Sequence, residues 1–152
     1  MTFNSQQLSI IRQQRAVNKK LIMITDIMKL FTVEEANDLL PSIRPKLEKI
    51  RVRYEKIASF REKVKAAAKA AESGGGGMKN ASFYVESLYE IGKLTTELHN
   101  LGVELKDYSR GLIDFPSLRD GRVVLLCWQL GESDKIEWWH DTEAGFAGRQ
   151  PL

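Results

Sequence analysis

The longest regular pattern of apolar positions runs from Ile43 to Ala71 and indicates one long helix. Apolar or small residues recur there at alternating spacings of four and three, interrupted once by Arg61. The positions are Ile43, Leu47, Ile50, Tyr54, Ile57, Val64, Ala68 and Ala71. A stripe with this heptad spacing packs against a facing helix. The pattern therefore predicts a helix pair in which this segment is the longer member.

A second, shorter stripe follows a run of glycines, Gly74 to Gly77. Its members are Tyr84, Leu88, Ile91, Thr95 and Leu98. Glycine is common just past a helix end because it adopts the positive φ required there. We therefore expect residues 41–102 to form a long antiparallel helical hairpin. Gly92, inside the second helix, should mark a close approach of the two helix backbones.

A short leading helix is predicted ahead of the hairpin. Thr32 and Glu35 have the capping-box spacing, in which each side chain accepts a hydrogen bond from the backbone amide of the other. Pro41 disfavours helical geometry in the residue before it, so this helix should end near Leu40 and the long helix should begin at Pro41. Pro45 would then lie in the first turn of the long helix or kink its start.

Beyond Gly102 the apolar period changes from helical to alternating, which predicts β-strands. Residues 103–108 are interpreted as a strand or a frayed helix turn, and residues 112–115 as a short strand closed by Pro116. Residues 122–130 form the clearest strand. Both of its faces are mainly apolar, so it should be a central strand that is covered on both sides.

The remaining chain completes the predicted architecture. Residues 135–140 should pair beside the central strand, which gives a three- or four-stranded antiparallel β-meander over 103–141 and a docked C-terminal tail over 142–152. The fold class is therefore α+β, with one domain over 29–152. Residues 1–28 differ, since Met1 to Thr25 contains no acid. We interpret them as a flexible or mis-assigned extension, with a targeting peptide as the alternative.

Composition restricts the setting of this domain. Apolar residues make up 43% of the chain, enough for a packed core, and no apolar run is long enough to span a bilayer. The single cysteine, Cys127, excludes an internal disulfide and fits a reducing compartment. We therefore expect a cytoplasmic protein without a membrane partner.

Charge is unevenly distributed although the net charge is only +3. Residues 44–69 carry ten basic and three acidic side chains, whereas residues 104–143 carry five basic and nine acidic ones. We expect the second helix to place its acids, Glu86, Glu90 and Glu97, on its outer face, which leaves the basic face without an internal partner. A second subunit or a nucleic acid could pair with these basic side chains. The simpler alternative is a basic face that is exposed to solvent. The basic face comprises Arg44, Lys46, Arg51, Arg53 and Lys65.

The best candidate for chemistry lies near the C-terminus. His140, Asp141 and Glu143 can converge at a strand end, and Asp114 or Asp107 on a neighbouring strand can complete a set that suits a divalent metal. The simpler interpretation is that His140 and Asp141 bond the backbone there. Arg149 is a candidate anion clamp. These residues assign neither a catalytic group nor a definite cofactor.

Three further side chains complete the list of candidates. Consecutive residues of a strand point to opposite faces, so Trp138 and Trp139 cannot both face the helices. One of them needs a cover from the tail, a partner or a ligand, which makes the pair a candidate binding surface. Cys127 lies mid-strand and is interpreted as a small buried apolar residue.

Several local motifs can be read along the chain: Phe31 to Asn37, Leu39 to Pro41, Gly102 to Asp107, Gly111 to Pro116, Arg119 to Arg122, Leu125 to Trp128, Trp139 to Asp141 and Glu143 to Arg149. Together they resemble those of the prokaryotic family known as domain of unknown function 2203. The resemblance covers about residues 31–152 and is most specific in the C-terminal third. It implies a small cytoplasmic protein of bacteria or archaea and no assigned activity.

Two classes of function, and a third alternative, follow from these patterns. The first is a non-enzymatic interaction or regulatory module that self-associates through the hairpin or through an uncovered sheet face. The second is a small enzyme or a metal- or ligand-binding protein with its site around His140, Asp141 and Glu143. The third is nucleic-acid binding through the basic helix 44–69, although helix-turn-helix and zinc-finger patterns are missing.

Overall fold

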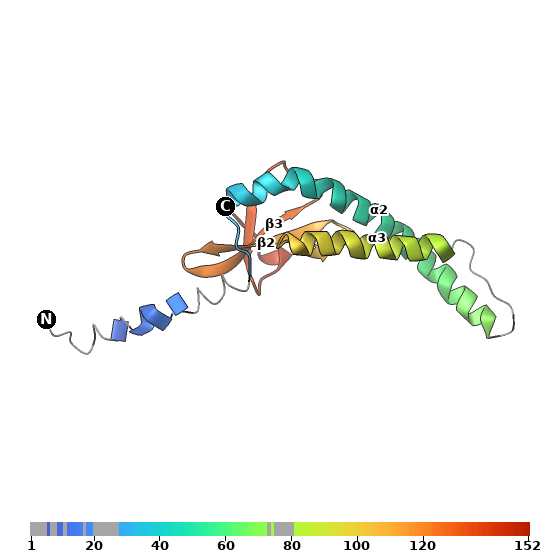
Figure 1. The fold of residues 1–152 in the computed structure, drawn as a ribbon, viewed down its shortest axis with the longest axis horizontal. Helices are drawn as coiled ribbons and strands as arrows, with labels where there is room; N and C mark the ends of the chain where they lie inside the picture. Colours follow the sequence, from blue (N-terminus) through green and yellow to red (C-terminus); the bar gives the residue numbers. More distant parts are fainter. Residues whose placement is uncertain are drawn as a thin grey trace.

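The computed structural model describes residues 28–72, 74 and 81–152, together with positions 6, 9–10, 12–16 and 18–19. Among the described residues from 28 onwards, the fold is α+β and combines two long α-helices with a five-stranded antiparallel sheet (Figure 1). Most of the extension 1–28 and of the glycine run lies outside the described residues, so the predictions for both segments stay predictions. The elements are α2 (Val33–Ala71), α3 (Ala81–Asn100), β1 (Glu104–Asp107), β2 (Leu112–Arg119), β3 (Arg122–Gln129), β4 (Trp138–Asp141), η1 (Phe146–Gly148) and β5 (Gln150–Pro151).

Helix α2 begins as predicted but does not stop at Pro41. Its capping box is present, with the Thr32 amide donating to Glu35 over 2.8 Å and the Glu35 amide donating to Thr32 over 3.1 Å. The prediction of a separate leading helix that ends near Leu40 is wrong, because α2 continues through Pro41 and Pro45 to Ala71.

Packing explains why two prolines fail to break α2. An apolar stripe runs across both of them with all its members buried, and the prolines themselves lie on the exposed side. Burying one Leu or Ile contributes about 1.5–3 kcal/mol, so the stripe outweighs the roughly 3 kcal/mol that each proline costs. The helix arches along its length (Figure 1), as expected for a helix containing prolines. The stripe comprises Ala36, Leu40, Ile43, Leu47, Ile50 and Ile57.

Helices α2 and α3 run antiparallel. The Phe60 and Phe83 rings lie 6.0 Å apart towards the end of the pair that is far from the sheet. Lys46 pairs with Glu97 near the sheet. Among the described residues, no helix is long and apolar enough to cross a membrane.

The buried face of α3 differs from the predicted one. It consists of Ser87, Ile91, Leu94 and Leu98, whereas Leu88 is exposed. With 3.6 residues per turn, positions 87 and 88 both neighbour Ile91, and the apolar character of Leu88 favoured the wrong choice. Gly92 also faces outward: no described atom outside its own turn lies within 4 Å of the Cβ that an alanine would add. The predicted approach of the two helix backbones at Gly92 is therefore wrong.

The sheet has five strands in the order β1-β2-β3-β4-β5, instead of the three or four predicted. The extra strand comes from the tail, where Gln150 pairs with Trp139. Asp120 and Gly121, with φ of 51° and 74°, form the two-residue turn that joins β2 to β3.

Strand β2 passes through Pro116, so the prediction that Pro116 closes this strand is wrong. The Pro116 carbonyl accepts a hydrogen bond from the Phe31 amide over 2.7 Å. In a strand the N and O atoms of one residue point to the same side. The N–H that Pro116 lacks would therefore face the edge beyond the end of β1, where the ladder requires no donor.

The two faces of the sheet have different covers. One face packs on the helices and forms the main core with them. On the other, η1 contacts β4 and the Arg149 guanidinium lies 5.1 Å from the Trp138 ring. The tail therefore helps to cover the second face. The helix-side face presents Ile113, Phe115, Val124, Leu126, Trp128 and Trp139, and the buried residues of the second face include Leu112, Asp114, Leu125, Cys127 and His140.

Candidate functional site

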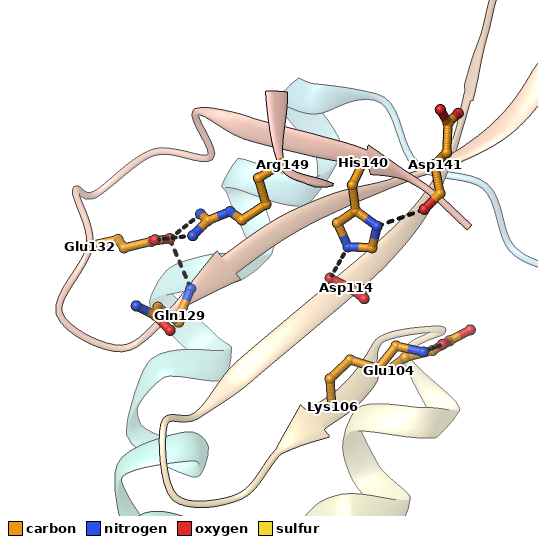
Figure 2. A network of polar contacts seen from close by, with 8 residues as sticks. All are labelled: Glu104, Lys106, Asp114, Gln129, Glu132, His140, Asp141 and Arg149. Carbon is orange, nitrogen blue, oxygen red and sulfur yellow. Dashed lines mark hydrogen bonds and ion pairs between the residues drawn. The ribbon is translucent and has the colours of Figure 1, made fainter. Parts of the chain in front are cut away.

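A cluster of three polar side chains is buried on the second face of the sheet. Asp114 on β2 lies directly opposite Cys127 on β3, and His140 on β4 lies diagonally across from Cys127. One ligand atom from each residue lies within 4.8 Å of the other two, and all three residues are buried. Figure 2 shows Asp114 and His140 facing each other across the sheet.

The hydrogen bonds of His140 restrict where its protons lie. Its Nδ1 is 2.8 Å from the backbone carbonyl of Asp141, and a carbonyl only accepts, so Nδ1 carries a hydrogen. Its Nε2 is 3.3 Å from Asp114 Oδ1 (Figure 2). A single proton therefore lies between the imidazole and the carboxyl group. Burial raises the pKa of Asp114, while the neighbouring His140 opposes this change.

Cys127 is a proton donor in this cluster. Burial, followed by the nearby Asp114 carboxylate, raises the pKa of the Cys127 thiol to about 12. At neutral pH the thiol is therefore protonated, which makes it a poor nucleophile. The interpretation of Cys127 as a small apolar residue holds for its burial but is wrong for its neighbours, which are a carboxyl group and an imidazole.

The structure does not bring together the whole predicted set around His140. Asp114 does lie against His140, but the Asp141 side chain pairs with Arg122 and only its carbonyl reaches the imidazole. Glu143 is exposed in the turn after β4. Because successive side chains of a strand alternate between faces, His140 and Asp141 could not both reach the second face.

Arg149 binds an internal anion. Its guanidinium donates to both carboxylate oxygens of Glu132 (Figure 2), over 2.6 and 2.8 Å. The Arg149 side chain is only 9% exposed. The same guanidinium lies over the Phe146 and Trp138 rings. This geometry fastens the tail to the turn after β3, so the predicted anion clamp closes on a carboxylate of the same chain.

Trp138 and Trp139 face opposite sides of the sheet, as the alternation predicted. Trp139 belongs to the core between sheet and helices, and its Nε1 donates to the Pro151 carbonyl over 3.2 Å. Trp138 is half-buried beneath Arg149. The cover that one tryptophan required is therefore supplied by the tail, and the pair offers little free surface to a partner.

Much of the predicted basic face has partners inside the chain. Arg44 pairs with Asp134 over 2.8 Å and Lys46 pairs with Glu97, so the expectation that Glu97 faces away from this set is wrong. Arg53 donates to Ser87 over 3.4 Å. These contacts reduce the positive charge available to an external polyanion.

Of the remaining two members of the basic face, Lys65 is exposed and Arg51 is half-buried. Lys65 pairs with Glu62 over 3.1 Å, and both side chains are exposed, so the pair contributes little to the stability of the fold. Arg51 forms no ion pair with any described residue. Nucleic-acid binding through residues 44–69 stays a prediction.

The outer side of α3 carries an apolar face that the sequence analysis missed. Val85, Leu88 and Tyr89 are 65%, 47% and 72% exposed, and Gly92 and Thr96 continue the face by one and two turns. The sequence did contain a signal for this face, because Leu88, Tyr89, Gly92 and Thr96 follow Val85 by three, four, seven and eleven residues, which is the spacing of one helix face. A groove of about 490 Å³ follows this face, lined by Leu88, Tyr89, Gly92, Lys93, Thr96 and Glu97.

Comparison with known proteins identifies the family. A family model described as an uncharacterized conserved protein, DUF2203, matches residues 29–152. The chain belongs to this family. No curated protein and no solved structure matches the chain.

The DUF2203 match includes every element from α2 to β5 and therefore both features described above. Its description names no activity. Any function must therefore be argued from the buried cluster and from the outer face of α3.

Proposed function

We propose that this DUF2203 protein is a non-enzymatic interaction module that self-associates through the outer face of α3. The observation that carries the proposal is the exposure of Gly92 in the middle of that helix. A helix-interior glycine costs about 1 kcal/mol relative to alanine. Within the protomer no described atom uses the space it leaves. Close packing of a partner helix against this surface would explain why a glycine is present here.

The side chains around Gly92 fit a helix partner. Val85, Leu88 and Tyr89 form an exposed apolar patch with the i, i+3, i+4 spacing of a helix that packs on another helix. Thr96 adds little polarity, because its hydroxyl donates to the Gly92 carbonyl over 2.9 Å. Large exposed apolar side chains gathered on one helix face are typical of interaction surfaces.

A second copy of this chain is the occupant that matches the surface best. In a two-fold antiparallel pair, each contact occurs twice with the residues exchanged. If the axis passes between Glu90 and Ile91, Tyr89 packs over Gly92 of the partner subunit. The phenol ring then enters the groove beside Gly92, and the glycine permits the approach.

Charge on the flank of α3 suits the same arrangement. Glu86, Glu90 and Lys93 share one side of the apolar face, and none of them forms an ion pair with a described residue. A two-fold axis places equivalent flanks side by side. Lys93 of each subunit then approaches Glu86 and Glu90 of the partner subunit, so the charges attract across the seam.

Paired aspartate substitutions test the proposal. Leu88→Asp places a charge in the centre of the face and should weaken self-association more than tenfold, because two carboxylates would be buried near the axis. The matched control is Val52→Asp, an apolar position 45% exposed on α2 and outside this face. It should leave the association unchanged.

Sedimentation of both variants at tens of micromolar distinguishes the outcomes. Helix content should match the unmodified chain in each case, because both positions are exposed. If the two variants associated equally strongly, α3 would not be the interface. If the unmodified chain were monomeric, the proposal of self-association would be wrong.

A further inference from the structure

The buried cluster on the second face offers one donor of each kind that binds a borderline divalent metal. Asp114 supplies a carboxylate oxygen, Cys127 a sulfur and His140 an imidazole nitrogen. Zinc accepts this mixed set, and three protein ligands with one further position for water are typical of its open sites. The three residues lie on adjacent strands, which hold their backbones in a fixed register.

The spacing of the donor atoms is close to what a metal requires. All lie within 4.8 Å of one another. In a tetrahedral zinc site, bonds of 2.0–2.3 Å place neighbouring ligand atoms about 3.5 Å apart. The widest separation therefore needs to close by at most about 1.3 Å, which side-chain torsions can supply without moving the strands.

The orientation of His140 already suits a ligand. Its Nδ1–H donates to the Asp141 carbonyl over 2.8 Å, which directs Nε2 towards Asp114. Metal-bound histidines commonly donate their second ring N–H to a carbonyl in this way, which fixes the ring and the tautomer. A metal would therefore meet an Nε2 whose position is set before binding.

We propose that Asp114, Cys127 and His140 form a binding site for a single divalent transition-metal ion, with zinc as the best match. The ion takes the place of the proton between Asp114 and His140 and of the thiol proton of Cys127. Both protons pass to solvent. A thiolate and a carboxylate then balance the two charges of the ion, and a formally neutral centre suits a buried position. This site is independent of the association through α3.

Cobalt substitution gives a direct test, because the chain contains one cysteine and two histidines. Chelator-treated protein is titrated with Co²⁺, and thiolate-to-cobalt charge-transfer absorption is followed in the near ultraviolet. A band with a stoichiometry of one can arise only from Cys127. Zn²⁺ should displace the Co²⁺ and raise the melting temperature of the unmodified chain.

Two substitutions and one control test the ligand assignment. Cys127→Ser should abolish the band, and Asp114→Asn, which keeps the side-chain shape, should weaken Co²⁺ binding by more than about tenfold. The control is His99→Gln, at the exposed end of α3, which should leave the band and the affinity unchanged. Circular dichroism of each variant without metal checks that the fold persists.

Three results would overturn the site. They are an unmodified chain without a band or a melting shift, a band that survives Cys127→Ser, and loss of binding in His99→Gln alone. The first would leave the cluster as a hydrogen-bonded part of the core. None of these results bears on the mass of the chain in solution, so failure of the metal site and failure of self-association are distinguishable.

Discussion

Asp107 organises the turn between β1 and β2 with one carboxylate oxygen. Its Oδ1 accepts from the Ser109 amide over 2.9 Å, from the Ser109 hydroxyl over 2.7 Å and from the Arg110 amide over 2.9 Å. These bonds, led by that from the Ser109 hydroxyl, lower the pKa of Asp107 to about 2. The carboxylate form is therefore the one that holds this turn.

The lowered pKa predicts a loss of stability in acid. A carboxyl group with a lower pKa in the folded chain stabilises the fold above its unfolded pKa of about 3.9 and loses that contribution as the pH falls through about 2. Asp107→Asn should lower the urea midpoint of unfolding at pH 7. The urea midpoint of this variant should also change less than that of the unmodified chain when the pH falls from 4 to 2. The effect should be modest because the side chain is partly exposed. Parallel pH curves for the two proteins would contradict this account.

Residue-level reasoning found part of the buried cluster. Asp114 and His140 were expected to be neighbours because both lie on predicted strands, and they do face each other. Asp141 was included only by ignoring the alternation of strand side chains, which the sequence itself supplies. The contact of Asp114 with Cys127 was also predictable. The two-residue turn at Asp120 and Gly121 fixes the register of β2 against β3 and pairs these residues.

At the scale of single elements, α3 supplies the most discriminating variant. Gly92→Ala should raise the free energy of unfolding of the monomer by about 1 kcal/mol, because alanine favours the helix and meets no described atom. The same methyl group would occupy the space over which Tyr89 of the partner subunit packs. The variant should therefore associate more weakly while its monomer becomes more stable.

Unfolding at low concentration and sedimentation at high concentration measure these two opposite effects. Ser59→Ala, exposed on α2 away from the face, is the control and should leave the association unchanged. If Gly92→Ala strengthened association together with stability, Gly92 would not be a contact point.

Other elements mark the limits of local sequence rules. The capping box and the strand over 122–130 were predictable because each is specified by neighbouring residues. The continuation of α2 through Pro41 was not, since it depends on burial of a stripe by a sheet that lies far along the chain. Strand β5 has only two residues, and the Arg149–Glu132 pair and the bond from Trp139 Nε1 to the Pro151 carbonyl help to hold it beside β4. These contacts join residues that lie apart in the sequence, so local rules did not predict the strand.

At the scale of the whole molecule, the chain supplies cover to both faces of its own sheet. The helices pack on one face, and η1 with Arg149 helps to cover the other. Self-association through an open sheet face, which the sequence left as an alternative to the hairpin, stays a prediction. The outer side of α3 stands out among the described residues, with three large apolar side chains exposed on one helix face.

The mass of the unmodified chain in solution tests the central claim most directly. Sedimentation equilibrium between about 1 and 50 µM should give a mass that rises towards twice the 17.3 kDa of one chain. A mass of 17.3 kDa at every concentration would contradict the account.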